Sequence, residues 1–192
     1  SEYETRLKIL RQTMHETGVD ACVLTSMHNV SYYSGFLYCS FGRPYAQVVT
    51  KTDTVTFSAG IDAAQPWRRC YGDNITYTDW QRHNYWRAIL SVTGTGKTIG
   101  FEGDHMSISQ MQLLNSFLAP KEKIDIAPAT MNQRMHKSLA ELALIRAGAA
   151  TADVGGYAIR DQIKCGAREI DIAMAGRDAM ELEIAKRYPD AE

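Results

Sequence analysis

The stretch Ala21-Cys22-Val23-Leu24 decides the fold class, because four apolar residues follow one another with no polar residue between them. A strand with one face in water alternates apolar and polar residues, whereas a strand covered on both faces is apolar throughout. Asp20 and Thr25 bound this run. We therefore predict an internal strand near the amino terminus, in a sheet that is covered on both faces.

The segments on either side of this strand carry local signals of their own. Before it, Gly18 ends a predicted helix whose apolar residues recur at four-three-four spacing and share one face. These residues are Tyr3, Leu7, Leu10 and Met14. After it, the short polar turn Lys51-Thr52-Asp53 separates residues 47–50 from residues 54–58, which predicts a β-hairpin.

Helices and strands alternate after the hairpin. We predict helices over 62–71, from Asp79 as N-cap through Leu90, and from Ser107 onward, with strands at 75–78, 97–102 and 124–126. In the helix after Ser107, one face carries Ile108, Met111, Leu114 and Leu118. Alternating helices and strands with one hairpin predict an α/β domain, in which helices flank a mixed sheet, over residues 1–137.

The sequence changes character at Ser138. Ser138 and Glu141 match a capping box, in which a hydroxyl and a carboxylate three residues apart satisfy free amides at a helix start. A long helix should run from there to Lys164, and a second one over 169–187 with Ile170, Ala173 and Met174 facing inward. Two helices without a sheet do not complete a domain. Residues 138–192 are therefore expected to be the first part of a second domain that is cut short.

Composition excludes several classes of function. The formal net charge of −1 gives no electrostatic footprint for nucleic acid or an anionic membrane. No apolar stretch is long enough for a membrane span, and the amino terminus lacks an apolar signal region. The four cysteines form no C-x-x-C pair and are expected to be reduced, and the five histidines show no metal-binding spacing. We expect a cytoplasmic protein without a metal or other cofactor in this stretch.

The segment Gly42-Arg43-Pro44, between the aromatic residues Phe41 and Tyr45, is the most informative for function. The proline fixes the backbone and pushes Arg43 toward extended geometry, which helps to aim the guanidinium. Such a planar fork suits a carboxylate, bound through two parallel hydrogen bonds. The alternative is an arginine that pairs with an acidic residue of its own domain beside core aromatics.

Two further segments have an ordinary structural explanation. Residues 94–98, Gly-Thr-Gly-Lys-Thr, resemble the end of a phosphate-binding loop, but Ser91 stands where that motif needs its first glycine, and the order of helix and strand is reversed. Residues 62–69 combine Asp62 as a helix cap with Pro66 in its first turn. Trp67, Arg68 and Arg69 in that segment fit either a dimer contact or packing and solvation.

Several blocks of this sequence together resemble the creatinase family, within the wider creatinase, prolidase and aminopeptidase P superfamily. They are Tyr32-Tyr33-Ser34-Gly35, Leu37-Tyr38-Cys39, Phe41-Gly42-Arg43, Ser58-Ala59-Gly60-Ile61-Asp62, Gln65-Pro66-Trp67-Arg68-Arg69, residues 72–80, Lys137-Ser138-Leu139-Ala140-Glu141 and Ala152-Asp153-Val154-Gly155-Gly156. The block over residues 58–80 separates the creatinases from the prolidases and aminopeptidases.

The resemblance implies a homodimer of two-domain subunits that hydrolyses creatine to sarcosine and urea without a metal. Residues 138–192 would then be the opening helices of a carboxyl-terminal α+β domain with the pita-bread fold. Phe41 and Arg43 match the small-domain residues that the family brings to the substrate bound by the other subunit, with Arg43 on the creatine carboxylate. The catalytic histidine is expected beyond Glu192, so this segment supplies no catalytic residue. A related amidino- or amidohydrolase and a non-catalytic binding module of the same fold remain the alternatives.

Overall fold

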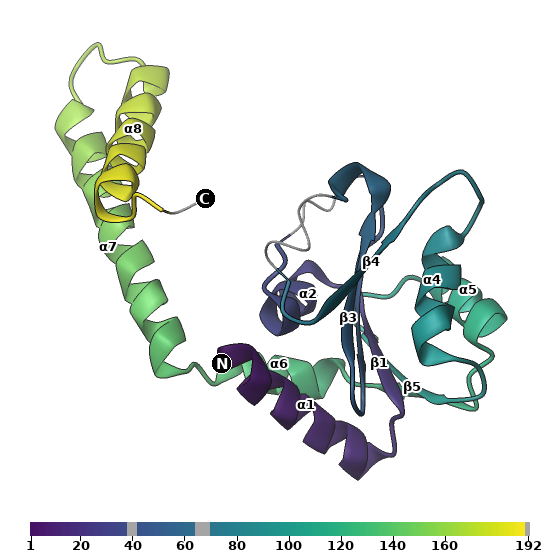
Figure 1. Ribbon diagram of the computed structural model, residues 1–192. Coiled ribbons are helices and arrows are strands. Elements are labelled where there is room, and N and C mark those ends of the chain that lie inside the picture. The colour runs from purple at the N-terminus through teal and green to yellow at the C-terminus, as the bar shows by residue number, and fades with distance from the viewer. Residues whose placement is uncertain (38–41, 64–69, 191–192) are drawn as a thin grey trace. The chain divides into compact units, whose positions relative to one another are not determined.

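The computed structural model describes residues 1–37, 42–63 and 70–190. The chain divides into two compact units, Ser1–Met135 and His136–Glu192. The first unit contains a six-stranded sheet, and the second contains a pair of long helices (Figure 1). Each unit is described by itself below.

The sheet of the first unit has the strand order β4-β3-β2-β1-β5-β6. Its strands are β1 (Ala21–Leu24), β2 (Ala46–Thr50), β3 (Thr54–Ala59), β4 (Asp73–Tyr77), β5 (Thr98–Phe101) and β6 (Glu122–Asp125). β2 runs antiparallel to both of its neighbours, and the other three pairs of strands are parallel. This confirms the predicted mixed sheet and its hairpin.

The position of β1 inside the sheet explains its unbroken apolar sequence. All four of its residues are buried. Ala21 and Val23 belong to one hydrophobic core, and Cys22 and Leu24 belong to the other. Because successive side chains of a strand point to opposite faces, β1 feeds both cores at once. The sheet therefore is covered on both sides, as predicted.

Helices form the outer layers (Figure 1). They are α1 (Glu2–Thr17), α2 (Met27–Ser34), α4 (Asn84–Thr93), α5 (Ile108–Leu118) and α6 (Ala127–Met135), with a short 3-10 helix η1 (Gly60–Asp62). α4 and α5 pack on one face, where Trp86, Ile89 and Leu114 are buried. α1, α2 and α6 cover the other face, where the Tyr33 hydroxyl of α2 donates to Gln133 of α6 at 2.8 Å.

Three expectations for this unit are corrected. Asp79 does not cap a helix, because α4 begins at Asn84 after His83, and it extends to Thr93 rather than Leu90. Ile108 is 81% exposed and so does not share the buried face of α5. Most of the helix expected over 62–71 lies outside the described residues, and Asp62 ends η1. The helices α2 and α6 were not predicted.

A buried carboxylate joins the two central parallel strands where they end. Glu102, which is 1% exposed, follows β5 and accepts hydrogen bonds from the residues that follow β1. The donors are the Ser26 amide at 2.8 Å, the Asn29 side chain at 2.6 Å, and the Thr25 amide and Ser26 hydroxyl. Asn29 also donates to Thr130 of α6 at 3.1 Å. One charged group therefore holds the starts of α2 and α6 against the sheet.

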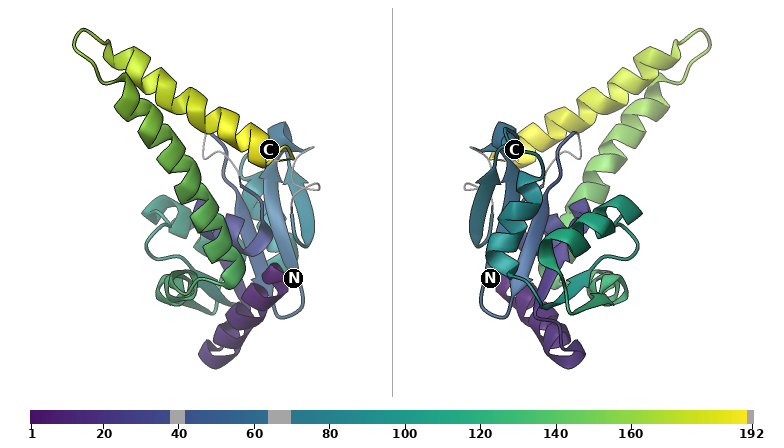
Figure 2. Two further views of the ribbon diagram at one scale, coloured as in Figure 1. Left: turned by 90° about the vertical axis from the view of Figure 1, so that its left-hand side faces the viewer. Right: turned by 90° about the vertical axis from the view of Figure 1, so that its right-hand side faces the viewer.

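The second unit is a pair of helices, α7 (Leu139–Gln162) and α8 (Glu169–Arg187) (Figure 2). Ser138 and Glu141 form the predicted capping box. The helices touch at Gly155 and Gly176, where an added Cβ would meet Met180 at 2.6 Å and Ile159 at 2.6 Å, respectively.

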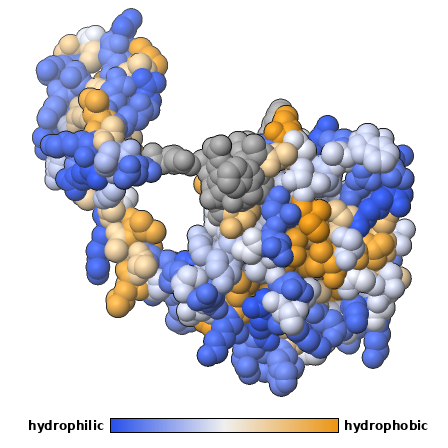
Figure 3. Space-filling view, viewed as in Figure 1, coloured by the Kyte–Doolittle hydropathy of each residue, from blue (hydrophilic) through white to orange (hydrophobic). Residues whose placement is uncertain are grey.

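The expected inward face of α8 is wrong. Ile170 is 59% exposed and Met174 40% exposed, and Ala173 is exposed as well. The contact instead lies on the face that carries Gly176, because two glycines let the helix backbones approach closely. Exposed apolar residues of the two helices leave orange patches on the surface of this unit in Figure 3.

We expect Glu102→Ala to lower the free energy of unfolding by about 3 kcal/mol, because several buried donors lose their acceptor at once. Urea unfolding followed by circular dichroism measures the change. Glu122→Ala, which removes an exposed carboxylate on β6, is the matched control and should leave stability within about 0.5 kcal/mol. Equal stability of the two variants would contradict a structural role for the buried carboxylate.

Candidate functional site

Strand order brings three distant segments to one edge of the sheet. β2 begins where β3 ends, since Ala46 is opposite Phe57 in their antiparallel register. β4 ends beside β3, with Tyr77 next to Ala59 in the parallel register. The segment before β2 and the segments after β3 and β4 must therefore lie close together. They contain Arg43, Asp62 and Asp79.

Arg43 and Asp79 form an ion pair at this edge. The Nε atom of Arg43 lies 2.7 Å from an Oδ atom of Asp79, and the two side chains are 51% and 49% exposed. Gly42 precedes the arginine with φ +81°, a left-handed conformation that favours glycine. The turn 42–44 thus places a charged side chain at the surface of the protein, where it still meets water.

Hydrogen bonds from buried tyrosines hold the turn 42–44 in place. The Tyr77 hydroxyl donates to the carbonyl of Pro44 at 2.7 Å, and the Tyr85 hydroxyl donates to the carbonyl of Tyr45 at 3.2 Å. The Tyr45 hydroxyl in turn donates to the carboxylate of Asp62. The rings of Tyr77 and Tyr85 meet edge to face, with centroids 5.6 Å apart. These contacts fix the backbone that follows Arg43.

Burial and the neighbouring charges of the ion pair shift the pKa of Tyr77. Burial raises the pKa of Tyr77 well above its usual value, and the nearby Asp79 carboxylate raises it further, while Arg43 lowers it. The phenol therefore stays protonated and keeps donating to Pro44 over the neutral pH range.

The ion pair lines a pocket of about 240 Å³. Its walls come from the turn before β2, the end of β4 and the first turns of α4 and α5: Gly42, Arg43, Pro44, Tyr77, Asp79, His83, Asn84, Tyr85, Trp86, Gln110 and Leu113. Sites that enclose a whole drug-sized ligand have about 300–1,000 Å³. This pocket is smaller, so it suits a small ligand, and the guanidinium of Arg43 suits an anionic group on that ligand.

Comparison with known proteins identifies the family. The model of the creatinase/prolidase N-terminal domain matches residues 6–136. The chain belongs to the creatinase/prolidase N-terminal domain family. A creatinase from Bacillus sp. (strain B-0618) is 45% identical over 187 residues, which cover 95% of this chain and 46% of that protein. The chain therefore spans about half the length of this curated relative.

Solved structures show the same fold at low sequence identity. A prolidase from Pyrococcus horikoshii OT3 superimposes with a TM-score of 0.78 at 17% identity, covering 93% of this chain and 49% of that one. The N-terminal domain of an X-Pro dipeptidase from Streptococcus pyogenes gives a TM-score of 0.60 at 18% identity, covering 69% of this chain and 99% of that one. At such identities the likeness shows the creatinase/prolidase fold and not the chemistry.

The predicted site residues are only partly described. Phe41 and the cluster Trp67, Arg68 and Arg69 lie outside the described residues. Arg43 forms an ion pair with Asp79, an acidic residue of its own unit, as the alternative interpretation of this segment predicts. Its half-exposed position also leaves it accessible to a ligand. The assignment of Arg43 to a substrate carboxylate stays a prediction for this member of the family.

Sequence reasoning missed the residues that surround Arg43. Asp79 was interpreted as a helix cap, and Tyr77 was assigned only to a strand. Tyr77 at the end of β4 and Asp79 two residues later both reach the turn 42–44, a contact that only the strand order reveals. His83 also stood out in no motif, yet it lines the pocket and adopts φ +64°, which is uncommon for a residue other than glycine.

Within residues 1–37, 42–63 and 70–190, no group of three or more histidine, cysteine, aspartate or glutamate side chains is placed to hold a metal ion. None of the helices in this part of the chain is both long and apolar enough to cross a membrane.

We expect Tyr77→Phe to lower the free energy of unfolding by about 1 kcal/mol at neutral pH, through loss of the hydroxyl bond to Pro44. Because the folded-state pKa of Tyr77 is raised, its contribution is complete below the unfolded pKa of about 10 and is lost as the pH rises above it. The stability of the variant should therefore fall less steeply at alkaline pH.

Urea unfolding at neutral pH and above about pH 10 measures both effects. Tyr157→Phe, on the exposed surface of α7, serves as the control and should change neither. An alkaline decline that is as steep in Tyr77→Phe as in the parent protein would contradict the prediction.

Proposed function

We propose that the full-length protein hydrolyses creatine to sarcosine and urea, and that this chain supplies the small domain that binds the substrate carboxylate. The observation that carries the proposal is the half-exposed guanidinium of Arg43, presented by an anchored turn at the mouth of a small aromatic pocket. The 45% identity to a creatinase supports the choice of substrate. Under this proposal the protein acts as a hydrolase of the creatinase/prolidase superfamily.

The chemistry explains why the substrate needs a binder such as Arg43. Creatine carries a carboxylate at one end and a guanidinium at the other, so its two ends need partners of opposite charge. Water must attack the guanidinium carbon, and a proton must reach the departing sarcosine nitrogen. One histidine with a pKa near neutrality can act first as base and then as acid. We expect that histidine beyond Glu192.

Arg43 contributes positioning in this scheme. A guanidinium that binds both oxygens of the carboxylate fixes the orientation of the substrate as well as its location. That orientation holds the reacting carbon at a set distance from the base. The reaction then proceeds as if both groups belonged to one molecule.

The second subunit is the partner that the proposal requires. Ile61 and Trp80 follow the ends of β3 and β4, which are neighbours in the sheet, and they are 85% and 83% exposed. Exposed tryptophan side chains are typical anchors of protein–protein interfaces. We propose that this edge contacts the other subunit of a homodimer and that Arg43 reaches the substrate there.

Two alternatives keep the fold and change the function. A related amidino- or amidohydrolase for another small acid would use Arg43 in the same way. A non-catalytic binding module of the same fold is the second alternative. A urea-release assay with creatine, beside hydrolysis assays with close carboxylated analogues, separates them, because a binding module turns over none of these compounds. We expect urea from creatine in the presence of a metal chelator, since the creatinase resemblance implies metal-independent hydrolysis.

We expect Arg43→Ala in the full-length protein to reduce kcat/KM for creatine by about 100-fold, mainly through KM, because a charge-assisted bidentate contact of about 3 kcal/mol is lost. Steady-state urea release measures the change. Arg82→Ala removes an exposed arginine that does not line the pocket and is the matched control. Unchanged catalytic efficiency in Arg43→Ala would refute the assignment of this residue.

We expect Trp80→Ser to weaken self-association of the full-length protein, raising the dimer dissociation constant by about 30-fold, as loss of a buried aromatic anchor does. Sedimentation velocity over a range of concentrations measures it. Ile9→Ser, at a 48% exposed position on α1, is the comparison variant and should dissociate like the parent protein. Equal dissociation constants for both variants would place the interface elsewhere.

A further inference from the structure

The backbone of the turn 42–44 is fixed, but backbone geometry alone does not aim an arginine. The side chain of Arg43 has several rotatable bonds, and the freedom that it loses on binding corresponds to about a 30-fold penalty in affinity. Arg43 is half-exposed, so packing does not restrict it fully. A charged partner on a neighbouring element is what can hold its guanidinium in one direction.

We propose that Asp79 is a positioning residue for Arg43: its carboxylate holds the Nε edge of the guanidinium and so presents the two terminal nitrogens to the substrate carboxylate. The contact that supports this is the 2.7 Å distance from Nε of Arg43 to Oδ2 of Asp79. A guanidinium can bind a carboxylate end-on through its two terminal nitrogens while a second acceptor occupies Nε. This inference rests on the proposed function of Arg43.

The support for Asp79 comes from the same strand that supports the turn. Tyr77 and Asp79 are two residues apart at the end of β4, and both reach the turn that carries Arg43. Tyr77 is 5% exposed and holds the carbonyl of Pro44, so it sets the distance between the two backbone segments. Asp79 therefore approaches Arg43 from a backbone segment that is held in place, although its half-exposed carboxylate also meets solvent.

Asp79 has two opposing effects on an anionic ligand. Fixing the side chain of Arg43 in advance removes up to about a 30-fold penalty. A second carboxylate near the site repels the ligand, which at a half-exposed position in water costs about fivefold. The first effect is larger, so the net result is about a fivefold tighter grip on the substrate. As an exposed ion pair, the contact itself adds little to the stability of the fold.

The test is a double-mutant cycle in the full-length protein, with urea release from creatine as the readout. Asp79→Asn should raise KM about fivefold and leave kcat and the melting temperature unchanged. In the Arg43→Ala background the same substitution should no longer raise KM and should lower it by up to about fivefold, because only the repulsion between the Asp79 carboxylate and the ligand is left to remove. Asp104→Asn, at an exposed position outside the pocket, is the control. A merely structural role would lower the melting temperature and would persist without Arg43.

A second measurement does not depend on turnover. In protein labelled with 15N-arginine, the side-chain Nε–Hε signal that Arg43→Ala removes is assigned to Arg43. Its order parameter should fall in Asp79→Asn and stay unchanged in Asp104→Asn.

Three results would overturn the role of Asp79: an equally mobile Arg43 in the parent protein and in Asp79→Asn, an unchanged or lowered KM in that variant, or an equal effect in the Arg43→Ala background. Failure of the proposed function looks different. The parent protein would then release no urea from creatine, or Arg43→Ala would leave efficiency unchanged, while the order parameter of Arg43 would still report on Asp79.

Discussion

The buried carboxylate of Glu102 is the constraint on which the first unit depends. A polar group at 1% exposure is tolerated only when hydrogen bonds replace its water, and here amide, hydroxyl and carboxamide donors of residues 25–29 do so. All of these donors follow β1, whereas Glu102 follows β5. The network therefore ties the ends of the two central parallel strands together, and through Asn29 and Thr130 it includes α6.

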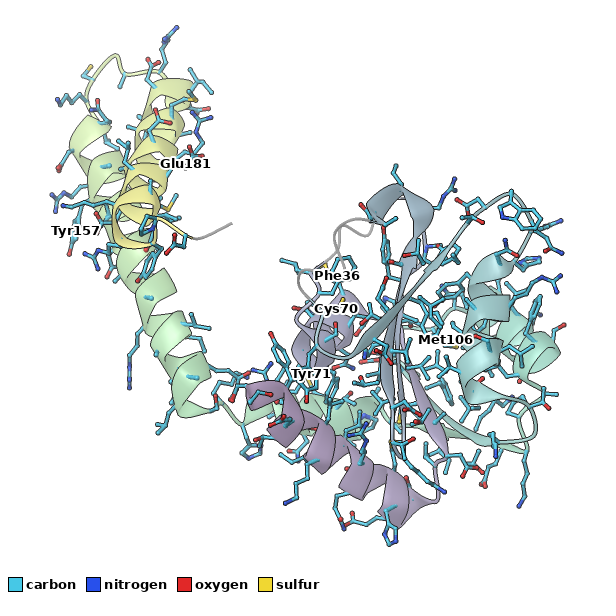
Figure 4. The ribbon with its side chains drawn as sticks, viewed as in Figure 1. Phe36, Cys70, Tyr71, Met106, Tyr157 and Glu181 are labelled. Atoms are coloured by element: carbon cyan, nitrogen blue, oxygen red, sulfur yellow. The ribbon has the colours of Figure 1, made fainter. Side chains whose placement is uncertain are left out.

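The same topology places the candidate site. β1, β3, β4 and β5 all end at one edge of the sheet, and β2, the single strand that runs the other way, begins there. The strand ends at that edge carry backbone groups and side chains that are not hydrogen-bonded to a neighbouring strand. Glu102 satisfies those between β1 and β5, and Arg43 with Asp79 occupies the part next to β2 and β4. Figure 4 draws the described side chains on the ribbon of Figure 1. Open α/β sheets bind ligands at such edges for this reason.

Local signals in the sequence predicted the local structure. The apolar run of β1, the polar turn of the hairpin and the Ser138 capping box each depend on residues within a few positions of one another, and each is confirmed. Asp79 shows where this reasoning ends. A carboxylate ahead of a helix fits an N-cap, and only strand order reveals that its partner is Arg43. The predicted inward face of α8 was wrong for a similar reason, because the close contact of two glycines carries no apolar signal.

The ion pair between Arg43 and Asp79 is compatible with substrate binding for a physical reason. In water two charges about 4 Å apart attract by about 1 kcal/mol, and exposed pairs contribute still less to stability. The same guanidinium gains several times more from a carboxylate once a second surface removes the water, because the effective dielectric constant falls from about 80 toward 20. The exposed pair with Asp79 is weak, so it costs little of the free energy that Arg43 gains from a ligand carboxylate once a second surface covers the site.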